Sequence, residues 1–264
     1  APQILGRLIA IGSLTSLIVY SCLWFLLELF QAPYIVNFFI AGSVCICLAL
    51  LMYFMFPIFP SKTAQNKNLV LRKRYWLYYL LTFLSGARRQ IFMVFAAFLM
   101  VEKFGYSASE VTLLFLINYA FNWFFAEKIG RLIGRIGERK ALTLEYIGLI
   151  FVFISYGLVN DATLAAGLYI LDHMFFAMAI AISTYFQKIA DPKDMASSAG
   201  VSFTINHIAA VIIPALLGLV WIWSHSLVFY VGACFAVLSL IAAQYIPSAP
   251  SPGNETIFAL QLNG

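Results

Sequence analysis

A basic, glycine-rich stretch, GRLIGRIGERK at residues 130–140, lies between two long apolar runs near the middle of the chain. Its three glycines, spaced four and three residues apart, are Gly130, Gly134 and Gly137. Its basic residues include Arg135, Arg139 and Lys140. Glycine has no Cβ and lets two backbones approach closely. Lys and Arg gather in the cytoplasmic loops of membrane proteins. The stretch therefore predicts a tight hairpin at a cytoplasmic membrane surface, with an ordinary basic turn as the alternative.

The rest of the chain is apolar enough to require a membrane. Of its 264 residues, 63% are hydrophobic and 10% are charged, whereas a soluble domain has roughly 25% charged residues. A hydrocarbon core of ~30 Å needs ~20 apolar residues per helix, and the chain has eight such runs. They lie near 8–29, 35–57, 76–100, 109–128, 141–159, 163–187, 197–222 and 227–246. Because the runs are continuously apolar, they predict an all-α, polytopic helical bundle instead of a barrel of alternating strands.

The basic residues fall on one side of the predicted helices. If the first run starts inside, thirteen of the sixteen Lys and Arg residues lie at inner ends and in inner loops. These are Arg7, Lys62, Lys67, Arg72, Lys73, Arg74, Lys128, Arg131, Arg135, Arg139, Lys140, Lys188 and Lys193. The outer side holds Lys103, and the remaining two, Arg88 and Arg89, lie within a run. The positive-inside rule thus orients every helix. Topology explains the net charge of +5, and we expect no nucleic-acid partner.

The spacing G-x-x-x-G-R-x-G-E-R-K resembles the loop signature of the major facilitator superfamily, G-x-x-x-D-R-x-G-R-R/K, which recurs between the second and third helices of each six-helix half. Gly134 stands where that signature has an acid, and Glu138 is an addition. The run SSAGVSFTINHIAAVIIPALLGLVW, residues 197–221, resembles the eleventh helix of the same superfamily. The resemblance implies a secondary transporter in the cytoplasmic (inner) membrane of a bacterium. Such a protein moves a small solute by alternating access, coupled to protons and without a cofactor; an anionic solute is one option.

The same resemblance divides the chain into four parts. Residues 1–57 correspond to the last two helices of an N-terminal half, and residues 58–75 to a basic cytoplasmic linker. Residues 76–246 correspond to the six helices of the C-terminal half, and residues 247–264 to a polar, mobile cytoplasmic tail. The first four helices would be missing from this segment. Because the family's cavity is lined mainly by its first, fourth, seventh and tenth helices, we expect the segment to need those N-terminal helices for transport.

Two adjacent arginines, Arg88 and Arg89, occur in the apolar run LSGARRQIFMVF at residues 84–95. An unpaired charge in such a run costs at least ~2.5 kcal/mol. Arg88 lies ~17 Å along its helix, near the middle of the bilayer, and Asp172 lies at nearly the same depth in another helix. We expect Arg89, with Arg88 on its flank, to face the cavity. There it would pair with Asp172 or hold an anionic group of the solute, with protonation near Asp172 or His173 as the switch.

Further polar side chains occur at membrane depth in the predicted helices. They are His173, Asn118, Asn122, Asn206 and His207. The asparagines are candidates for solute contact, with interhelical packing worth ~0.6 kcal/mol each as the alternative. The histidines are candidate proton sites, with a structural role as the alternative. Glu145 is expected near an inner helix end, either solvated or paired with Arg135 or Arg139.

Two rival classes of function compete with transport. Cys22, Cys45, Cys47 and Cys234 lack the spacing of a disulfide framework or a metal site, so they predict small core residues and no metal. An intramembrane enzyme would need a nucleophile and a base, or a metal cluster, at one depth. No such motif occurs in the sequence, so no catalytic residue is predicted. A non-transporting scaffold or assembly factor on the same fold is the remaining alternative, and it would show no flux.

Overall fold

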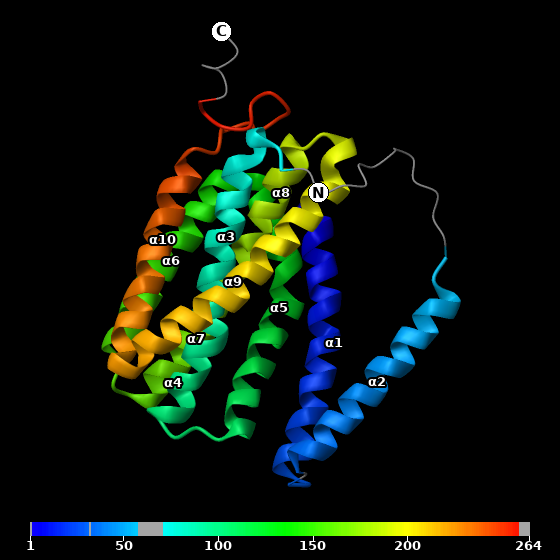
Figure 1. Ribbon diagram of the computed structural model, residues 1–264, viewed down its shortest axis with the longest axis vertical. Helices are drawn as coiled ribbons and strands as arrows, with labels where there is room; N and C mark the ends of the chain where they lie inside the picture. Colours follow the sequence, from blue (N-terminus) through cyan, green and yellow to red (C-terminus); the bar gives the residue numbers. More distant parts are fainter. Residues whose placement is uncertain (1, 32, 58–70, 259–264) are drawn as a thin grey trace.

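The computed structural model describes residues 2–31, 33–57 and 71–258 (Figure 1). Every regular element in these ranges is a helix. Two N-terminal helices, α1 (Pro2–Glu28) and α2 (Tyr34–Met55), come first. Residues 58–70 of the predicted linker and residues 259–264 of the predicted tail lie outside the described residues.

Six membrane-length segments follow α2, and two of them contain irregular turns. The first consists of η1 (Lys73–Tyr75), α3 (Trp76–Gln90), the π-helical η2 (Ile91–Ala96) and α4 (Ala97–Glu102). The next two are α5 (Ala108–Ile136) and α6 (Glu138–Leu158). The fourth consists of α7 (Ala162–Phe176), the 3-10 turn η3 (Ala177–Ala179) and α8 (Ile180–Ile189). The last two are η4 (Pro192–Asp194) with α9 (Met195–Trp223), and α10 (His225–Gln244).

The all-α membrane bundle predicted from the sequence is confirmed. In the described part of the chain, seven segments are long and apolar enough to cross a membrane. The eighth predicted run, 109–128, belongs to α5, whose hydropathy is lowered by Asn118 and Asn122 in its middle. With 29 residues, α5 is about 43 Å long and can still span a hydrocarbon core of ~30 Å. The predicted count of eight is therefore approximate.

The predicted hairpin at 130–140 is much shorter than expected. α5 continues to Ile136 and α6 begins at Glu138, so Gly137 alone joins the two helices. Its φ of +85° is one that side chains with a Cβ rarely adopt. Gly130 instead lies where α5 meets α1, because a Cβ there would be 2.5 Å from the carbonyl oxygen of Pro2. The close backbone approach thus occurs between α1 and α5.

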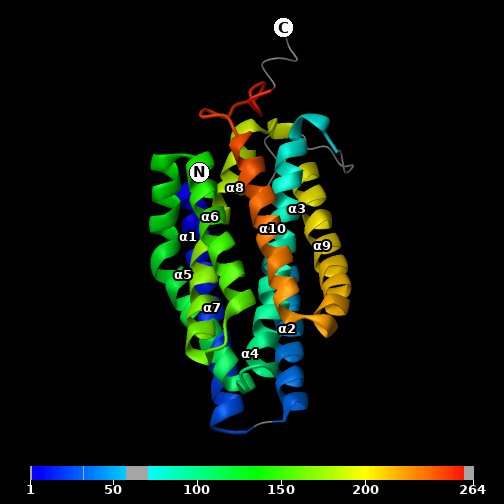
Figure 2. The ribbon, with the colours of Figure 1, turned by 90° about the vertical axis from the view of Figure 1, so that its left-hand side faces the viewer.

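The helices from α3 onward form one bundle. α3 packs against α9 and α10, while α6 packs against α10 and α7. α1 lies along α5 on one flank of this bundle, and α2 stands apart at its edge (Figure 1). Figure 2 shows α3 between α10 and α9. The central position of α3 explains why Arg88 reaches the interior of the bundle.

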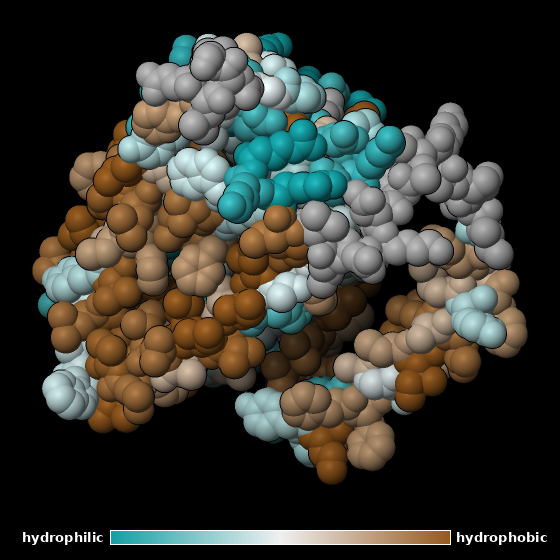
Figure 3. All heavy atoms as spheres, turned by 45° about the horizontal axis from the view of Figure 1, so that its top comes forward, coloured by the Kyte–Doolittle hydropathy of each residue, from teal (hydrophilic) through white to brown (hydrophobic). Residues whose placement is uncertain are grey.

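The surface of the molecule matches a bilayer. Figure 3 shows apolar side chains over the flanks and polar ones gathered at the end that comes forward, which is the top of Figure 1. Large apolar side chains such as Phe151, 68% exposed, and Val211, 71% exposed, lie in mid-helix, where lipid would cover them. The starts of α1, α3 and α9 and the ends of α8 and α10 all lie at the polar end (Figure 1). The basic segments therefore share one end of the bundle, and its cytoplasmic placement stays a prediction.

The first part of the tail is folded, contrary to the expectation of a mobile segment. The Tyr185 hydroxyl donates to the carbonyl oxygen of Glu255 at 2.5 Å. The amide of Ile257 donates to the carbonyl oxygen of Tyr245 at 3.0 Å. Glu255 and Thr256 are buried. The tail up to residue 258 thus returns to the ends of α8 and α10, and the expectation of mobility is wrong for this part.

Candidate functional site

Three ionisable side chains from three helices lie near one another inside the bundle. Arg88 of α3, Glu145 of α6 and Asp172 of α7 are each 0% exposed. Arg88 Nη2 lies 3.6 Å from Glu145 Oε1, and Arg88 Nη1 donates to Ser239 Oγ of α10. The guanidinium also lies over the ring of Tyr146, 4.4 Å from its centroid. Arg88 and Glu145 both act electrostatically on Asp172. We call Arg88, Glu145 and Asp172 the buried charge cluster; it holds two carboxyl groups and one cation.

Hydrogen bonding within the buried charge cluster is incomplete. No described residue donates a hydrogen bond to the carboxyl oxygens of Asp172 or Glu145. The hydroxyls of Tyr156 and Tyr169, which lie within electrostatic range of Asp172, also lack partners among the described residues. A buried polar group without a partner costs about 1–3 kcal/mol. Unpaired buried groups of this kind occur at functional sites and at sites of ordered water.

Arg88, and not Arg89, is the buried arginine. Leu81, Leu84 and Arg88 are three and four residues apart and share the buried face of α3. Arg89 is exposed, because one residue along a helix turns the side chain by about 100°. The expected pairing of Arg89 with Asp172 is therefore wrong. The alternative role of Arg89, contact with an anionic group of the solute, stays a prediction.

Glu145 is the cluster member that sequence reasoning missed. It was expected in solvent or paired with Arg135 or Arg139. α6 begins seven residues before it, so Glu145 lies about 10 Å along the helix. Its face of α6 also carries Leu142 and Leu149, both 0% exposed. The spacing of three and four residues from these leucines is the signal that could have identified it.

The two helices that carry Arg88 and Asp172 both become irregular just beyond those residues. The π-helical η2 follows Arg88 and Arg89, and η3 follows Asp172 and His173 within five residues. π-helical turns within α-helices are frequent at functional sites, and 3-10 turns in mid-helix often mark hinges. Each helix therefore has a point where it can bend close to the buried charge cluster.

A cavity of about 280 Å³ opens between α1, α5, α7 and α8. Its lining is Ile9, Asn122, His173, Phe176, Ala177, Ala179, Ile180 and Ser183. The amide nitrogen of Asn122 lies 2.9 Å from His173 Nε2 and donates to it when that ring nitrogen is unprotonated. His173 directly follows Asp172 in α7. Two consecutive residues of α7 thus connect the two features: Asp172 belongs to the buried charge cluster and His173 lines the cavity. We call this space the His173 cavity.

Other predicted residues lie elsewhere. Asn118 is 0% exposed, and neither polar atom of its side chain has a partner among the described residues. Asn206 and His207 each bond to the carbonyl oxygen four residues earlier in α9. A Cβ on Gly86 would lie 2.8 Å from Asn206 Oδ1, so Asn206 fills the contact between α3 and α9. His207 is exposed, and neither residue reaches the buried charge cluster.

The cysteines are not core residues. Cys22, Cys45, Cys47 and Cys234 are free and exposed. Among the described residues they lie on the helix surface and not in the core as predicted. Among the described residues, no three His, Cys, Asp or Glu side chains are grouped so that they could hold a metal ion.

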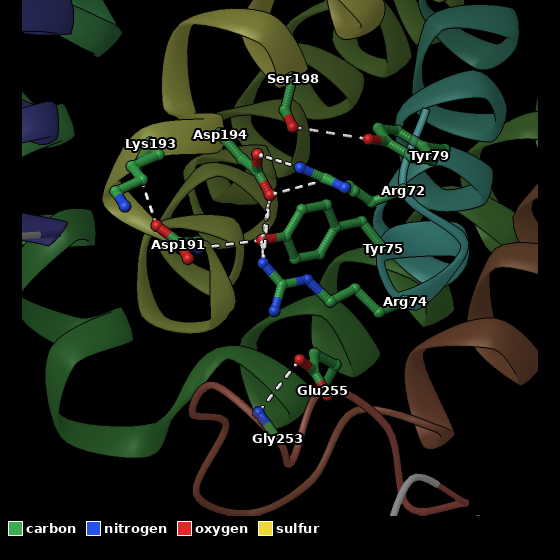
Figure 4. A network of polar contacts seen from close by, with 10 residues as sticks. All are labelled: Arg72, Arg74, Tyr75, Tyr79, Asp191, Lys193, Asp194, Ser198, Gly253 and Glu255. Carbon is green, nitrogen blue, oxygen red and sulfur yellow. Dashed lines mark hydrogen bonds and ion pairs between the residues drawn. The ribbon is translucent and has the colours of Figure 1, made fainter. Parts of the chain in front are cut away.

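A polar network joins helix ends on the polar side of the bundle (Figure 4). The carboxylate of Asp194, 3% exposed, accepts hydrogen bonds from Arg72 at 3.2 Å and from Arg74 at 3.1 Å. The Tyr75 hydroxyl donates to the same carboxylate at 3.3 Å. That hydroxyl accepts from the amide of Asp191 at 2.9 Å. The network fastens the start of α3 to the connection between α8 and α9.

Two residues of the basic loop stretch also make contacts between helices. Glu138 is 2% exposed and lies 2.7 Å from Lys188 Nζ, which ties α6 to α8. Arg139 donates to Gln244 Oε1 at 3.2 and 3.3 Å, which ties α6 to α10. The stretch therefore anchors the polar ends of three helices.

Comparison with known families agrees with this architecture. The family model described as Major Facilitator Superfamily matches the chain over residues 2–214 and, in a second alignment, over residues 78–260. The chain belongs to the major facilitator superfamily. No curated protein sequence matches it.

Membership in the major facilitator superfamily fixes the broad function. Proteins of this family are transporters that move small solutes across membranes. This major facilitator chain is accordingly an integral membrane protein.

Proposed function

We propose that this major facilitator protein moves a small polar solute through the His173 cavity and couples that movement to a proton held by the buried charge cluster. One observation carries the proposal. Asp172 belongs to the buried charge cluster, while the next residue, His173, lines the cavity. A change of charge at Asp172 therefore acts on the helix that forms the cavity wall.

The proton follows from the charges in the cluster. Taking an ion out of water costs several kcal/mol unless it is paired. Two carboxylates beside a single guanidinium leave one negative charge without a partner, and one proton makes the cluster neutral. Glu145 lies 3.6 Å from Arg88, whereas Asp172 forms no ion pair with a described residue. We therefore assign the proton to Asp172 in this state.

The His173 cavity suits a small solute that forms hydrogen bonds. Asn122, His173 and Ser183 offer an amide, an imidazole and a hydroxyl, while Phe176 and Ile180 supply apolar surface. Its volume of about 280 Å³ lies just below the range of ~300–1,000 Å³ that is typical of ligand sites. None of the residues that line it is an acid, a lysine or an arginine. A neutral solute thus fits better than an anion, which would need Arg89.

In the proposed motion, the helices bend at the irregular turns η2 and η3. Alternating access requires parts of the bundle to rock or bend around a site near mid-membrane. η3 itself lines the His173 cavity through Ala177 and Ala179. When Asp172 loses its proton, it competes with Glu145 for Arg88. Such a change of partner would exert a force on α3 and α7 next to their irregular turns.

Helices outside this segment would complete the solute path. The low burial of α1 and α2 supports this part of the proposal. α1 buries only Gly6 and Ser13 among its described residues, and α2 buries none. In our division of the chain, these are the last two helices of the first half, and the opposite cavity wall comes from its first four.

The cavity can be tested by thiol accessibility. We expect Ser183→Cys, in the complete protein with its native cysteines replaced by serine, to react with a membrane-impermeant methanethiosulfonate from either side of the membrane. Ser183 lines the cavity and is exposed, and a solute pathway must open to both sides. The rates would be measured in right-side-out and inside-out vesicles.

A matched control separates the cavity from the lipid surface. Phe151→Cys places a thiol on an exposed mid-helix position of α6, which lipid would cover, so we expect no reaction from either side. Reaction of Ser183→Cys from one side only, or from neither, would contradict a transport role for the His173 cavity. If the protein is a non-transporting scaffold, we expect Ser183→Cys to react from neither side.

A further inference from the structure

A groove that shares no lining residue with the His173 cavity combines aromatic walls with one carboxylate. It lies between η2 and α4 on one side and α9 on the other, and the start of α10 borders it. The lining is Val94, Phe95, Phe98, Glu102, Pro214, Gly218, Trp221, Ile222 and His225. Its volume is about 690 Å³, which lies within the range of drug-sized ligand sites, ~300–1,000 Å³. We call it the Trp221 groove.

Trp221 organises the walls of this groove. It is 6% exposed, and its Nε1 donates to Glu102 Oε2 at 2.7 Å. The rings of Phe95 and Phe98 each lie 5.4 Å from the Trp221 ring, centroid to centroid. The imidazole of His225 stacks on Trp221 at 4.3 Å. Four aromatic rings thus surround one end of the groove.

The carboxylate of Glu102 remains available to a ligand. Its side chain is 44% exposed, and only Oε2 takes part in the bond to Trp221. The nearest lysine in the chain, Lys103, is bonded away from it, to the carbonyl oxygen of Val159 at 2.6 Å and to Asn160 at 2.9 Å. His225 Nε2 lies 3.8 Å from the Glu102 oxygen that Trp221 binds.

The shape of the groove also restricts its ligand. Glu102 lies at the outer end of α4, and Val94 lies eight residues deeper, or ~12 Å along the helix. A Cβ on Gly218 would have no heavy atom within 4 Å, so the floor is open at that point. Apart from Glu102 and His225, the lining is apolar. The ligand therefore needs a long apolar body with a positive charge at one end.

We propose that the Trp221 groove binds an amphipathic organic cation, with the positive group at Glu102 and the apolar body along Phe98, Gly218 and Pro214. Aromatic rings attract cations through their π faces, and a carboxylate supplies the counter-charge. An ammonium group could belong to a free amphiphile or to a lipid headgroup, and we commit to the free amphiphile. The site is independent of the His173 cavity, so failure of one proposal leaves the other standing.

Equilibrium binding of radiolabelled decyltrimethylammonium to the complete protein in phosphatidylglycerol nanodiscs tests the proposal. We expect saturable binding above that of protein-free discs. Glu102→Gln keeps the acceptor for Trp221 and removes the charge, so it should weaken binding about tenfold, as loss of a charged contact does. Glu28→Gln removes an exposed carboxylate from the outer end of α1 and should leave the affinity unchanged. Unlabelled decyl sulfate should not compete.

Several results would overturn the proposal. Binding that does not saturate, or equal affinity in Glu102→Gln and the unaltered protein, would show that Glu102 holds no cation. Equal competition by decyl sulfate would show that the apolar decyl group alone drives binding of the probe. Loss of probe binding in phosphatidylethanolamine discs would assign the groove to the lipid headgroup instead. Equal thermal unfolding of the variants would establish that each one is folded.

Discussion

Arg88→Met should lower the free energy of unfolding by about 3–5 kcal/mol, the range found when one partner of a buried ion pair is removed. The side chain of Arg88 is 0% exposed and is the cation that faces both Glu145 and Asp172. Without it, two buried carboxyl groups must stay neutral, and Ser239 loses its donor. Unfolding in mixed detergent micelles by titration with dodecyl sulfate measures the change.

The neighbouring arginine provides the matched control. Arg89→Met removes the same charge one position along α3, where the side chain is exposed, and should change stability by no more than about 0.5 kcal/mol. Arg88→Met with Glu145→Gln should recover part of the loss, with a coupling energy of about 0.5–3 kcal/mol. Equal effects of the two arginine substitutions, or strictly additive effects of Arg88→Met and Glu145→Gln, would mean that the buried charge cluster does not act as a unit.

Infrared spectroscopy should detect one protonated carboxyl group in the buried charge cluster at neutral pH. In Asp172→Asn, Glu145 remains beside Arg88, no surplus carboxylate is left, and the carboxylic-acid band should disappear. In Glu145→Gln, Asp172 becomes the partner of Arg88, and the band should disappear as well. In Arg88→Met, both acids need a proton, so the band should roughly double. The expected proton counts are thus one in the unaltered protein, none in Asp172→Asn or Glu145→Gln, and two in Arg88→Met.

Glu138→Gln is the control for the infrared experiment. Glu138 is buried like the cluster acids but pairs with Lys188 at 2.7 Å, so we expect it to be ionised and the band to stay unchanged. A band that is absent from the unaltered protein, or one that persists in both Asp172→Asn and Glu145→Gln, would contradict a proton on this cluster.

The sequence predicted the class of fold and most helix positions because the physical signal was strong. Long apolar runs and the one-sided distribution of cations both follow from the bilayer. The same signal could not show that α5 continues through Gly130 and Gly134 to Ile136, because a basic, glycine-containing stretch can be helical or looped. Positive φ at Gly137 became evident only in the structure.

The candidate site was predicted in part. Depth along the helices placed Asp172 level with Arg88 and Arg89, and the structure brings Arg88 and Asp172 into the buried charge cluster. Choosing between Arg88 and Arg89 required the buried face of α3, which depends on how α3 packs against α9 and α10. Glu145 was missed because a start at residue 141 placed it too near the helix end. The turns η2 and η3 have no sequence signature that we recognised.

The central claim is that the proton on Asp172 governs the side to which the His173 cavity opens. The most direct test is the ratio of the inside and outside reaction rates of Ser183→Cys, measured as a function of pH. The same pH is imposed on both sides, so ionisation of the thiol cancels in the ratio. We predict that the ratio changes by about tenfold or more with pH when Asp172 is present, which corresponds to ~1.4 kcal/mol of shift between two states. In Asp172→Asn with Ser183→Cys, the ratio should not depend on pH; an unchanged pH dependence in that double variant would contradict the claim.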